Sequence, residues 1–236
     1  MPGFLETQLA LVTGASRGIG AAIAEALARE GAHVVLTARD AAGLEAVEER
    51  IHDAGGSATI APADLTESDS VARLAAAVGG RWHALDMLVL NAAMLGTLTP
   101  VAQIDGKELN RLLTLNLLAQ QALIAGFDPL LRRSDRARVI GITSSVGAKP
   151  RAYWGAYGAS KAALENLLLS YAEAVANISA IRVALVNPGP TATEMRASAY
   201  PGEDPAILKP PAAVGEAIVD LLRNDFETGT RVEIPQ

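Results

Sequence analysis

A tyrosine and a lysine stand four residues apart in the stretch "YWGAYGASKAAL", as Tyr157 and Lys161. Residues i and i+4 share one face of a helix, so on a helix the ammonium would lie beside the phenol. A free phenol has a pKa of about 10, and lowering it by about 3 units requires roughly 4 kcal/mol, for which a close ammonium is one source. The spacing therefore predicts that Tyr157 is an acid–base catalyst; the alternative is an amphipathic tyrosine on a buried helix. Tyr153 is eight residues from Lys161, and we expect it to pack or to line a substrate pocket.

The stretch "VTGASRGIG", residues 12–20, follows an apolar run and precedes a stretch of helical period. Glycines at 14, 18 and 20 suit a tight turn, close approach of the backbone to a pyrophosphate, and packing of the helix against a strand. A glycine triplet alone would be compatible with an ordinary turn between a strand and a helix. In the context of a strand, a helix and a second strand, it predicts a dinucleotide-binding loop.

Short apolar runs rich in β-branched residues alternate with stretches of helical period along the chain. The runs are "LALVT", "HVVLTA", "SATIAPA", "LDMLVL", "ARVIGIT", "IRVALVN" and "TRVEI". This alternation is typical of βαβ units, and nearly continuous apolar strands are typical of a parallel sheet buried on both faces. We therefore predict an α/β doubly wound Rossmann fold of about seven parallel strands, with helices on both faces, in one domain over residues 1–236.

The segment 195–211, "MRASAYPGEDPAILKPP", has no clear period and contains prolines, a glycine and acidic residues. Too few residues follow it for a second domain, so we expect a mobile lid over the carboxyl edge of the sheet. An apolar substrate pocket is expected from six side chains, those of Met94, Tyr153, Trp154, Met195, Tyr200 and Ile207.

Composition excludes several classes of function. A net charge of −6 provides no basic field for nucleic acid, and there is no cysteine to form a disulfide or a thiolate ligand. The three histidines stand far apart, so we expect no metal site. The run 87–104 is interrupted by polar residues and proline, and the amino-terminal stretch does not resemble a secretory or transit signal. We expect no membrane contact and a cytoplasmic location.

The glycine spacing G-x-x-x-G-x-G resembles that of the short-chain dehydrogenase/reductase family, of the single-domain type. Further similarities follow in that family's order over nearly the whole chain: "ADLTE" with Asp64, "LNAA" with Asn91, "LTLNLLA" with Asn116, then "ITSSVG", "YGASK" and "NPGPTATEM". Leu90 and Ala93 depart from the family's usual asparagine and glycine. The resemblance implies hydride transfer between a nicotinamide cofactor and a small carbonyl or alcohol substrate.

The resemblance also implies roles for individual residues. Tyr157 would protonate the carbonyl oxygen, Ser144 would hold that oxygen, and Lys161 would bind the nicotinamide ribose and lower the tyrosine pKa. Asn116 would position a water that links Lys161 to solvent. Ser145 remains an alternative to Ser144, because both hydroxyls follow the fifth strand. The implied cofactor-binding residues are Gly14, Ser16, Arg17, Gly18, Ile19, Gly20, Arg39, Asp64, Leu65, Asn91, Ala92, Tyr157, Lys161, Pro188, Gly189, Thr191 and Thr193.

The end of the second strand favours NADP(H), with NAD(H) possible. NAD-selective relatives have an acidic residue there that binds the ribose hydroxyls, but Ala38 occupies this position. Arg39 follows directly and Arg17 lies in the glycine-rich loop, so two guanidinium groups could flank a 2′-phosphate. Asp40 turned inward would instead favour NAD.

Two other functions and an assembly remain open at this point. One alternative is a 3-oxoacyl-carrier-protein reductase, which favours a basic patch at the site entrance. Arg132, Arg133, Arg136 and Arg138 precede a strand and are expected at the opposite edge. The other is a non-catalytic dinucleotide-sensing protein, in which loss of Tyr157 or Lys161 would be expected. Apolar residues on more than one stripe of the helix 157–177 predict a homodimer or homotetramer.

Overall fold

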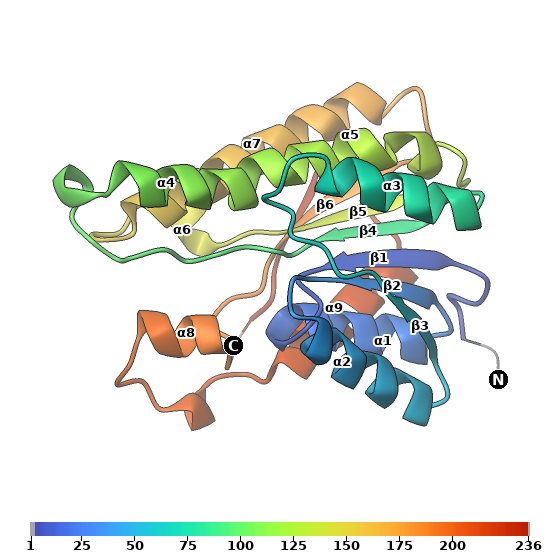
Figure 1. Ribbon diagram of the computed structural model, residues 1–236, viewed down its shortest axis with the longest axis horizontal. Coiled ribbons are helices and arrows are strands. Elements are labelled where there is room, and N and C mark those ends of the chain that lie inside the picture. Colours follow the sequence, from blue (N-terminus) through green and yellow to red (C-terminus); the bar gives the residue numbers. More distant parts are fainter. Residues whose placement is uncertain (1–2, 236) are drawn as a thin grey trace.

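A parallel seven-stranded sheet runs through the computed structural model, which describes residues 3–235 (Figure 1). The strand order is β3-β2-β1-β4-β5-β6-β7. From β1 the chain therefore adds β2 and β3 on one side and β4 to β7 on the other, so the strand order reverses between β1 and β4. The strands are β1 (Leu9–Thr13), β2 (His33–Thr37), β3 (Ser57–Ile60), β4 (Met87–Leu90), β5 (Arg138–Ile142), β6 (Arg182–Asn187) and β7 (Thr230–Glu233).

Helices cover both faces of this sheet. The first face carries α1 (Gly18–Arg29), α2 (Ala41–Asp53) and α9 (Pro211–Arg223), and the other carries α3 (Ser70–Arg81), α5 (Ala119–Leu131) and α7 (Gly155–Val175) (Figure 1). Shorter elements lie beyond the carboxyl edge of the strands. These are η1 (Val101–Gln103), α4 (Gly106–Leu113), the π-helical turn η2 (Thr114–Leu118), α6 (Ser145–Ala148), α8 (Glu194–Ala199) and η3 (Pro205–Ile207).

The strand pattern has a simple physical cause. All residues of β1 and β4 are buried, because helices cover both faces and water reaches neither. β7 alternates between half-buried and exposed residues, since it is an edge strand. Separate apolar clusters lie on the two faces of the sheet, one against α1 and α9 and the other against α5 and α7. The predicted doubly wound fold is confirmed.

Parallel strands bring the sequence motifs to one edge. The glycine-rich loop follows β1, Asn91 follows β4, Ser144 follows β5 and Pro188 follows β6. In doubly wound sheets, ligands bind at this carboxyl edge, where the strand order reverses. Arg138 begins β5 and lies at the opposite edge, as expected for the arginine cluster.

The segment 195–211 has more regular structure than we expected. Thr193 caps α8 by accepting a hydrogen bond from the Arg196 backbone N–H at 3.1 Å, and Asp204 caps η3 in the same way. Arg196 forms a bidentate pair with Glu203 at 2.5 Å. A capped helix only six residues long carries too weak a period to be visible in the sequence. Within residues 3–235, no helix has both the length and the apolarity needed to cross a membrane.

Candidate active site

A cavity of about 1280 Å³ opens at the carboxyl edge of the sheet, lined by the loops after β1, β2, β3, β4, β5 and β6. Every predicted site residue lines it except two, Gly20 and Asn116. The predicted residues that line the cavity are Gly14, Ser16, Arg17, Gly18, Ile19, Arg39, Asp64, Leu65, Asn91, Ala92, Ser144, Tyr157, Lys161, Pro188, Gly189, Thr191 and Thr193.

The glycine-rich loop leaves room for a ligand at the start of α1. Gly14 and Gly18 have backbone φ angles of 65° and 59°, which residues other than glycine rarely adopt. A Cβ on Gly20 would lie 2.2 Å from the Gly14 carbonyl oxygen, so Gly20 acts through packing and not by contact with the cavity. No side chain caps α1, and no acidic residue lies in its first turn. Free N–H groups at a helix start that faces a cavity suit a pyrophosphate, so this loop fits a dinucleotide.

Asn91 fastens the end of β4 to the end of β1. Its side-chain amide donates to the Thr13 carbonyl at 2.9 Å. The Thr13 hydroxyl accepts from the backbone N–H groups of Asn91 and Ala92 at 2.9 and 3.0 Å, and donates to Val89 at 3.0 Å. Thr13 is fully buried. Thr13 was not predicted as a site residue, because its place at the end of an apolar strand was the only available signal.

Charged groups near the end of β2 are arranged around Asp64. Its carboxylate accepts from the Thr66 backbone and hydroxyl at 2.9 and 2.7 Å. Burial opposes ionisation, but these hydrogen bonds and Arg39 lower the pKa of Asp64. Arg39 lies 3.8 Å from Asp64, and the guanidinium is 68% exposed. The Asp40 carboxylate instead accepts from the Gly43 backbone and caps α2.

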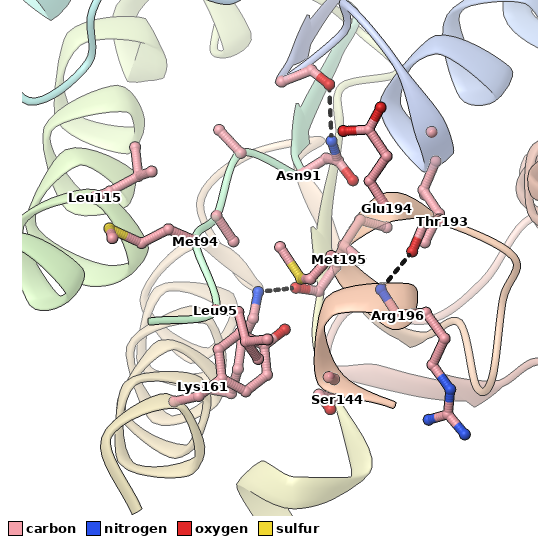
Figure 2. A pocket seen from close by; sticks show the side chains of 18 of the residues that line it. Asn91, Met94, Leu95, Leu115, Ser144, Lys161, Thr193, Glu194, Met195 and Arg196 are labelled. Carbon is pink, nitrogen blue, oxygen red and sulfur yellow. Dashed lines mark hydrogen bonds between the residues drawn. The ribbon is translucent and has the colours of Figure 1, made fainter. Parts of the chain in front are cut away.

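Tyr157 and Lys161 lie together in the first two turns of α7, as their spacing predicts. Both are buried, at 8% and 2% exposure, although both contact the cavity. The Lys161 Nζ lies 5.8 Å from the centre of the Tyr157 ring and donates to the Ile142 carbonyl at 2.8 Å, a bond drawn in Figure 2.

The structure does not give Tyr157 the low pKa that the sequence led us to expect. Burial raises the pKa of Tyr157 to about 12. Burial also lowers the pKa of Lys161 to about 8, although Glu165 opposes this change. Loss of water around the phenolate outweighs the nearby ammonium, so Tyr157 is a neutral phenol at pH 7. A neutral phenol is the protonation state that a proton donor requires.

The two serines differ in placement. Ser144 has an extended backbone at the junction of β5 and α6 and is half-buried, whereas Ser145 begins α6 and is exposed. Both line the cavity.

Asn116 lies inside the protein and does not line the cavity. Its carbonyl oxygen accepts from the Met94 N–H at 2.8 Å, and its amide donates to the Met94 carbonyl at 2.9 Å and to the Ser160 hydroxyl at 3.1 Å. It lies in the π-helical turn between α4 and α5, and such turns are frequent at functional sites. In this structure Asn116 therefore joins the loop after β4 to α7.

The loop after β6 closes the far side of the cavity. Gly189 has a φ of 63°, and its N–H donates to the Asn187 side chain at 3.1 Å. The buried Thr191 hydroxyl donates to the Pro188 and Gly189 carbonyls at 3.3 and 3.2 Å. The turn thus holds Thr191 and the α8 cap Thr193 beside the cavity.

The expected apolar pocket is only partly present. Met94, Trp154, Met195 and Tyr200 line the cavity, and Figure 2 shows Met94 and Met195 on elements from opposite sides. Tyr153 does not line it; its side chain is 58% exposed and its φ is 73°. Ile207 also lies outside the cavity lining. The prediction for these two residues was wrong: Tyr153 has a left-handed backbone in the turn before α7, and Ile207 ends η3 with 61% of the residue exposed.

Three cationic side chains on the cavity wall were not predicted from the sequence. Lys107 and Arg111 project from α4, and Arg151 precedes α7. No group of three or more potential metal ligands occurs within the part of the chain that the structure describes.

Comparison with known proteins agrees with this geometry. The family model described as short chain dehydrogenase matches residues 8–204. The uncharacterized oxidoreductase YciK of Escherichia coli K12 is 35% identical over 229 residues, which cover 96% of this chain and 90% of that protein. A short chain dehydrogenase from Salmonella enterica serovar Typhi superposes with a TM-score of 0.94 at 33% identity, over 99% of this chain and 98% of that one. A protein from Shigella flexneri 2a, described as complexed with NADP, gives a TM-score of 0.93 at 34% identity, over 99% of both chains. The chain therefore belongs to the short-chain dehydrogenase/reductase family and is an NAD(P)-dependent oxidoreductase.

Proposed function

We propose that the chain interconverts a small carbonyl compound and its alcohol with NADP(H), and that Tyr157 is the acid–base group. The observation that carries this proposal is the buried pair of Tyr157 and Lys161 on one wall of a cavity whose other wall is the glycine-rich loop.

In the direction of reduction, the chain's own residues manage a proton and a developing charge. The bound nicotinamide cofactor supplies the hydride. Tyr157 donates its hydroxyl proton to the carbonyl oxygen, and Ser144, favoured over Ser145 by its place at the strand end, donates a hydrogen bond to that oxygen. Lys161 is cationic below a pH of about 8 and stabilises the phenolate that remains.

The remaining predicted residues would hold the dinucleotide. Gly14, Gly18 and the start of α1 suit the pyrophosphate, and Asp64 and Leu65 lie where the adenine is expected. Asn116 acts as a positioning residue through its bonds to Met94 and Ser160.

Three observations support NADP(H) over NAD(H). The Asp40 carboxylate is engaged at the start of α2, so it does not supply the acidic group that would bind the ribose hydroxyls. Arg17 and Arg39 line the cavity, and their exposed ion pairs with Glu194 and Asp64 are of the kind that contributes little and exchanges readily. The similar Shigella protein is described as complexed with NADP.

Tyr157→Phe tests the assignment of the acid–base group. This variant should bind the dinucleotide nearly as wild type does, measured by fluorescence titration, while turnover of a panel of aldehydes and ketones is lost. Tyr153→Phe is a matched control that should retain turnover, because Tyr153 lies outside the cavity. Equal turnover by Tyr157→Phe and wild type would exclude Tyr157 as the acid.

Arg39→Ala tests the cofactor. The preference for NADPH over NADH, expressed as the free energy that corresponds to the ratio of the two kcat/KM values, should fall by about 1–2 kcal/mol in the variant. This is the size of a charge-assisted contact. A wild-type preference for NADH, or a ratio that the substitution leaves unchanged, would contradict the role of Arg39.

We also propose a homodimer or homotetramer in the cytoplasm, and a closing movement of residues 195–211 over the substrate. Leu118 of η2 is 57% exposed, and Leu167 and Tyr171 of α7 are half-buried. Light scattering at micromolar concentration checks the assembly, and a monomer would count against it. The arginine cluster near β5 does not favour a carrier-protein reductase, since it lies at the far edge of the sheet.

A further inference from the structure

Arg151 is a cation at the substrate end of the cavity without a carboxylate partner among the described residues. Its Nη1 donates to the Tyr200 hydroxyl, and its guanidinium carbon lies 6.0 Å from the centre of the Trp154 ring. Both partners are neutral. The Trp154 ring in turn lies 5.9 Å from the Tyr157 ring, at a steep angle of 70°. One aromatic ring therefore separates Arg151 from the proposed acid.

Three of the four other guanidinium groups that line the cavity are already compensated. Arg17 pairs with Glu194 at 3.0 Å, Arg39 lies 3.8 Å from Asp64, and Arg196 pairs with Glu203. The third carboxylate that lines the cavity, that of Asp40, caps α2. No carboxylate of the cavity wall is therefore left to neutralise Arg151.

The loop that carries Arg151 is held in place by backbone bonds. The Trp154 N–H donates to the Arg151 carbonyl at 3.2 Å, and the Thr99 N–H donates to the Tyr153 carbonyl at 3.1 Å. Tyr153 has a left-handed φ of 73° within this turn. A guanidinium on a fixed turn loses less conformational entropy when it binds a ligand.

The free atoms of Arg151 fit a carboxylate. Because Nη1 contacts Tyr200, the edge formed by Nε and Nη2 remains for two parallel hydrogen bonds, the geometry that a carboxylate matches. The rings of Trp154 and Tyr200, 5.7 Å apart, provide an apolar surface beside it. We propose that the substrate is a carbonyl compound or alcohol with an apolar body and a carboxylate, and that Arg151 binds this carboxylate.

The proposal rests on the proposed function for the reaction itself, so binding and turnover are measured separately. Binding is measured by calorimetric titration of benzoate and benzamide into the enzyme saturated with NADP⁺. Turnover is measured as kcat/KM for 4-carboxybenzaldehyde and for its methyl ester with NADPH. In each pair the two compounds have similar bodies and differ in charge.

Wild type should favour the charged member of each pair by roughly 10-fold or more, the size of a charge-assisted hydrogen bond. Arg151→Met should lose this preference, and Arg151→Lys, which keeps the charge without the planar fork, should retain part of it. Arg133→Met is the matched control at the opposite edge, where the guanidinium donates to the His83 carbonyl, and should leave the preference unchanged. Circular dichroism and thermal unfolding establish that each variant is folded.

The outcomes separate this inference from the proposed function. Equal affinity for benzoate and benzamide, or a preference for the charged compound that survives in Arg151→Met, overturns the inference. Turnover of the methyl ester in that case still supports the proposed reaction. A preference lost in Lys107→Gln or Arg111→Gln but kept in Arg151→Met overturns the assignment to Arg151. An Arg151-dependent preference for benzoate without turnover of any carbonyl compound supports the anion site and overturns the reaction instead.

Discussion

Replacing Lys161 by methionine should stabilise the protein at neutral pH while abolishing its activity. Lys161 is 2% exposed, and burial lowers its pKa from the ordinary 10.5 to about 8. Each pH unit of such a difference is worth about 1.4 kcal/mol, so keeping this ammonium buried at pH 7 destabilises the folded state by roughly 3 kcal/mol. Methionine has a similar length and no charge. Loss of the bond to the Ile142 carbonyl offsets about 1 kcal/mol, which leaves a net stabilisation of about 2 kcal/mol.

The pH dependence of this effect has a definite sign. Between pH about 8 and 10.5 the unfolded chain binds the lysine proton more than the folded chain does, so wild-type stability rises with pH in that window. Below pH 8 the penalty is fully present. By pH 9.5 it falls to roughly 1.4 kcal/mol, so the advantage of Lys161→Met should shrink to nearly zero.

Urea unfolding followed by circular dichroism at pH 7 and pH 9.5 measures this difference. Other groups titrate in both proteins, so the comparison of wild type with Lys161→Met removes their contribution. Lys149→Met changes an exposed lysine and should shift stability by less than about 0.5 kcal/mol at either pH. A Lys161→Met protein less stable than wild type at pH 7, or a difference independent of pH, would refute the reasoning.

Three further predictions follow from the same structure. The rate of carbonyl reduction should be constant below pH 8 and fall above it, because Lys161 loses its proton with a pKa of about 8; a profile flat to pH 10 would show that this charge is not needed. Gly20→Ala should destabilise the protein and weaken dinucleotide binding, since its Cβ would lie 2.2 Å from a backbone oxygen, whereas Gly80→Ala, which meets nothing within 4 Å near the end of α3, should stabilise it by about 0.5–1 kcal/mol in thermal unfolding. Asn116→Ala should lower the free energy of unfolding by about 2–4 kcal/mol, because it leaves the Met94 N–H and carbonyl without their partner; a loss below 0.5 kcal/mol would mean that water replaces the amide.

Much of the fold could be predicted from the sequence because the relevant signals are local. Short runs rich in apolar and β-branched residues marked all seven strands, and the i, i+4 spacing placed Tyr157 and Lys161 on one helix face. The short helix α8 was not predicted, because its stability comes from the Thr193 cap and the Arg196–Glu203 pair more than from a repeating pattern.

Long-range contacts could not be predicted in the same way. Thr13 reads as one more strand residue, yet its hydroxyl joins β1 to the loop after β4 across 78 positions. Asn116 resembled a residue that orders water, but its amide is used within the protein, by Met94 and Ser160. Which atoms satisfy a buried polar group depends on elements that are distant in sequence.

The sequence by itself determined the family, the parallel sheet, and the edge at which the chemistry takes place, because glycine spacing, apolar period and the Tyr157–Lys161 pair are properties of short segments. Only the tertiary structure decided the electrostatics of that pair, since the pKa of Tyr157 reflects how much water the packed chain removes. It also decided that Arg151 lines the cavity beside Trp154 and Tyr200, while Tyr153 lies exposed outside the cavity lining. Burial and charge compensation arise from many distant segments meeting at once, and a linear sequence does not specify that meeting residue by residue.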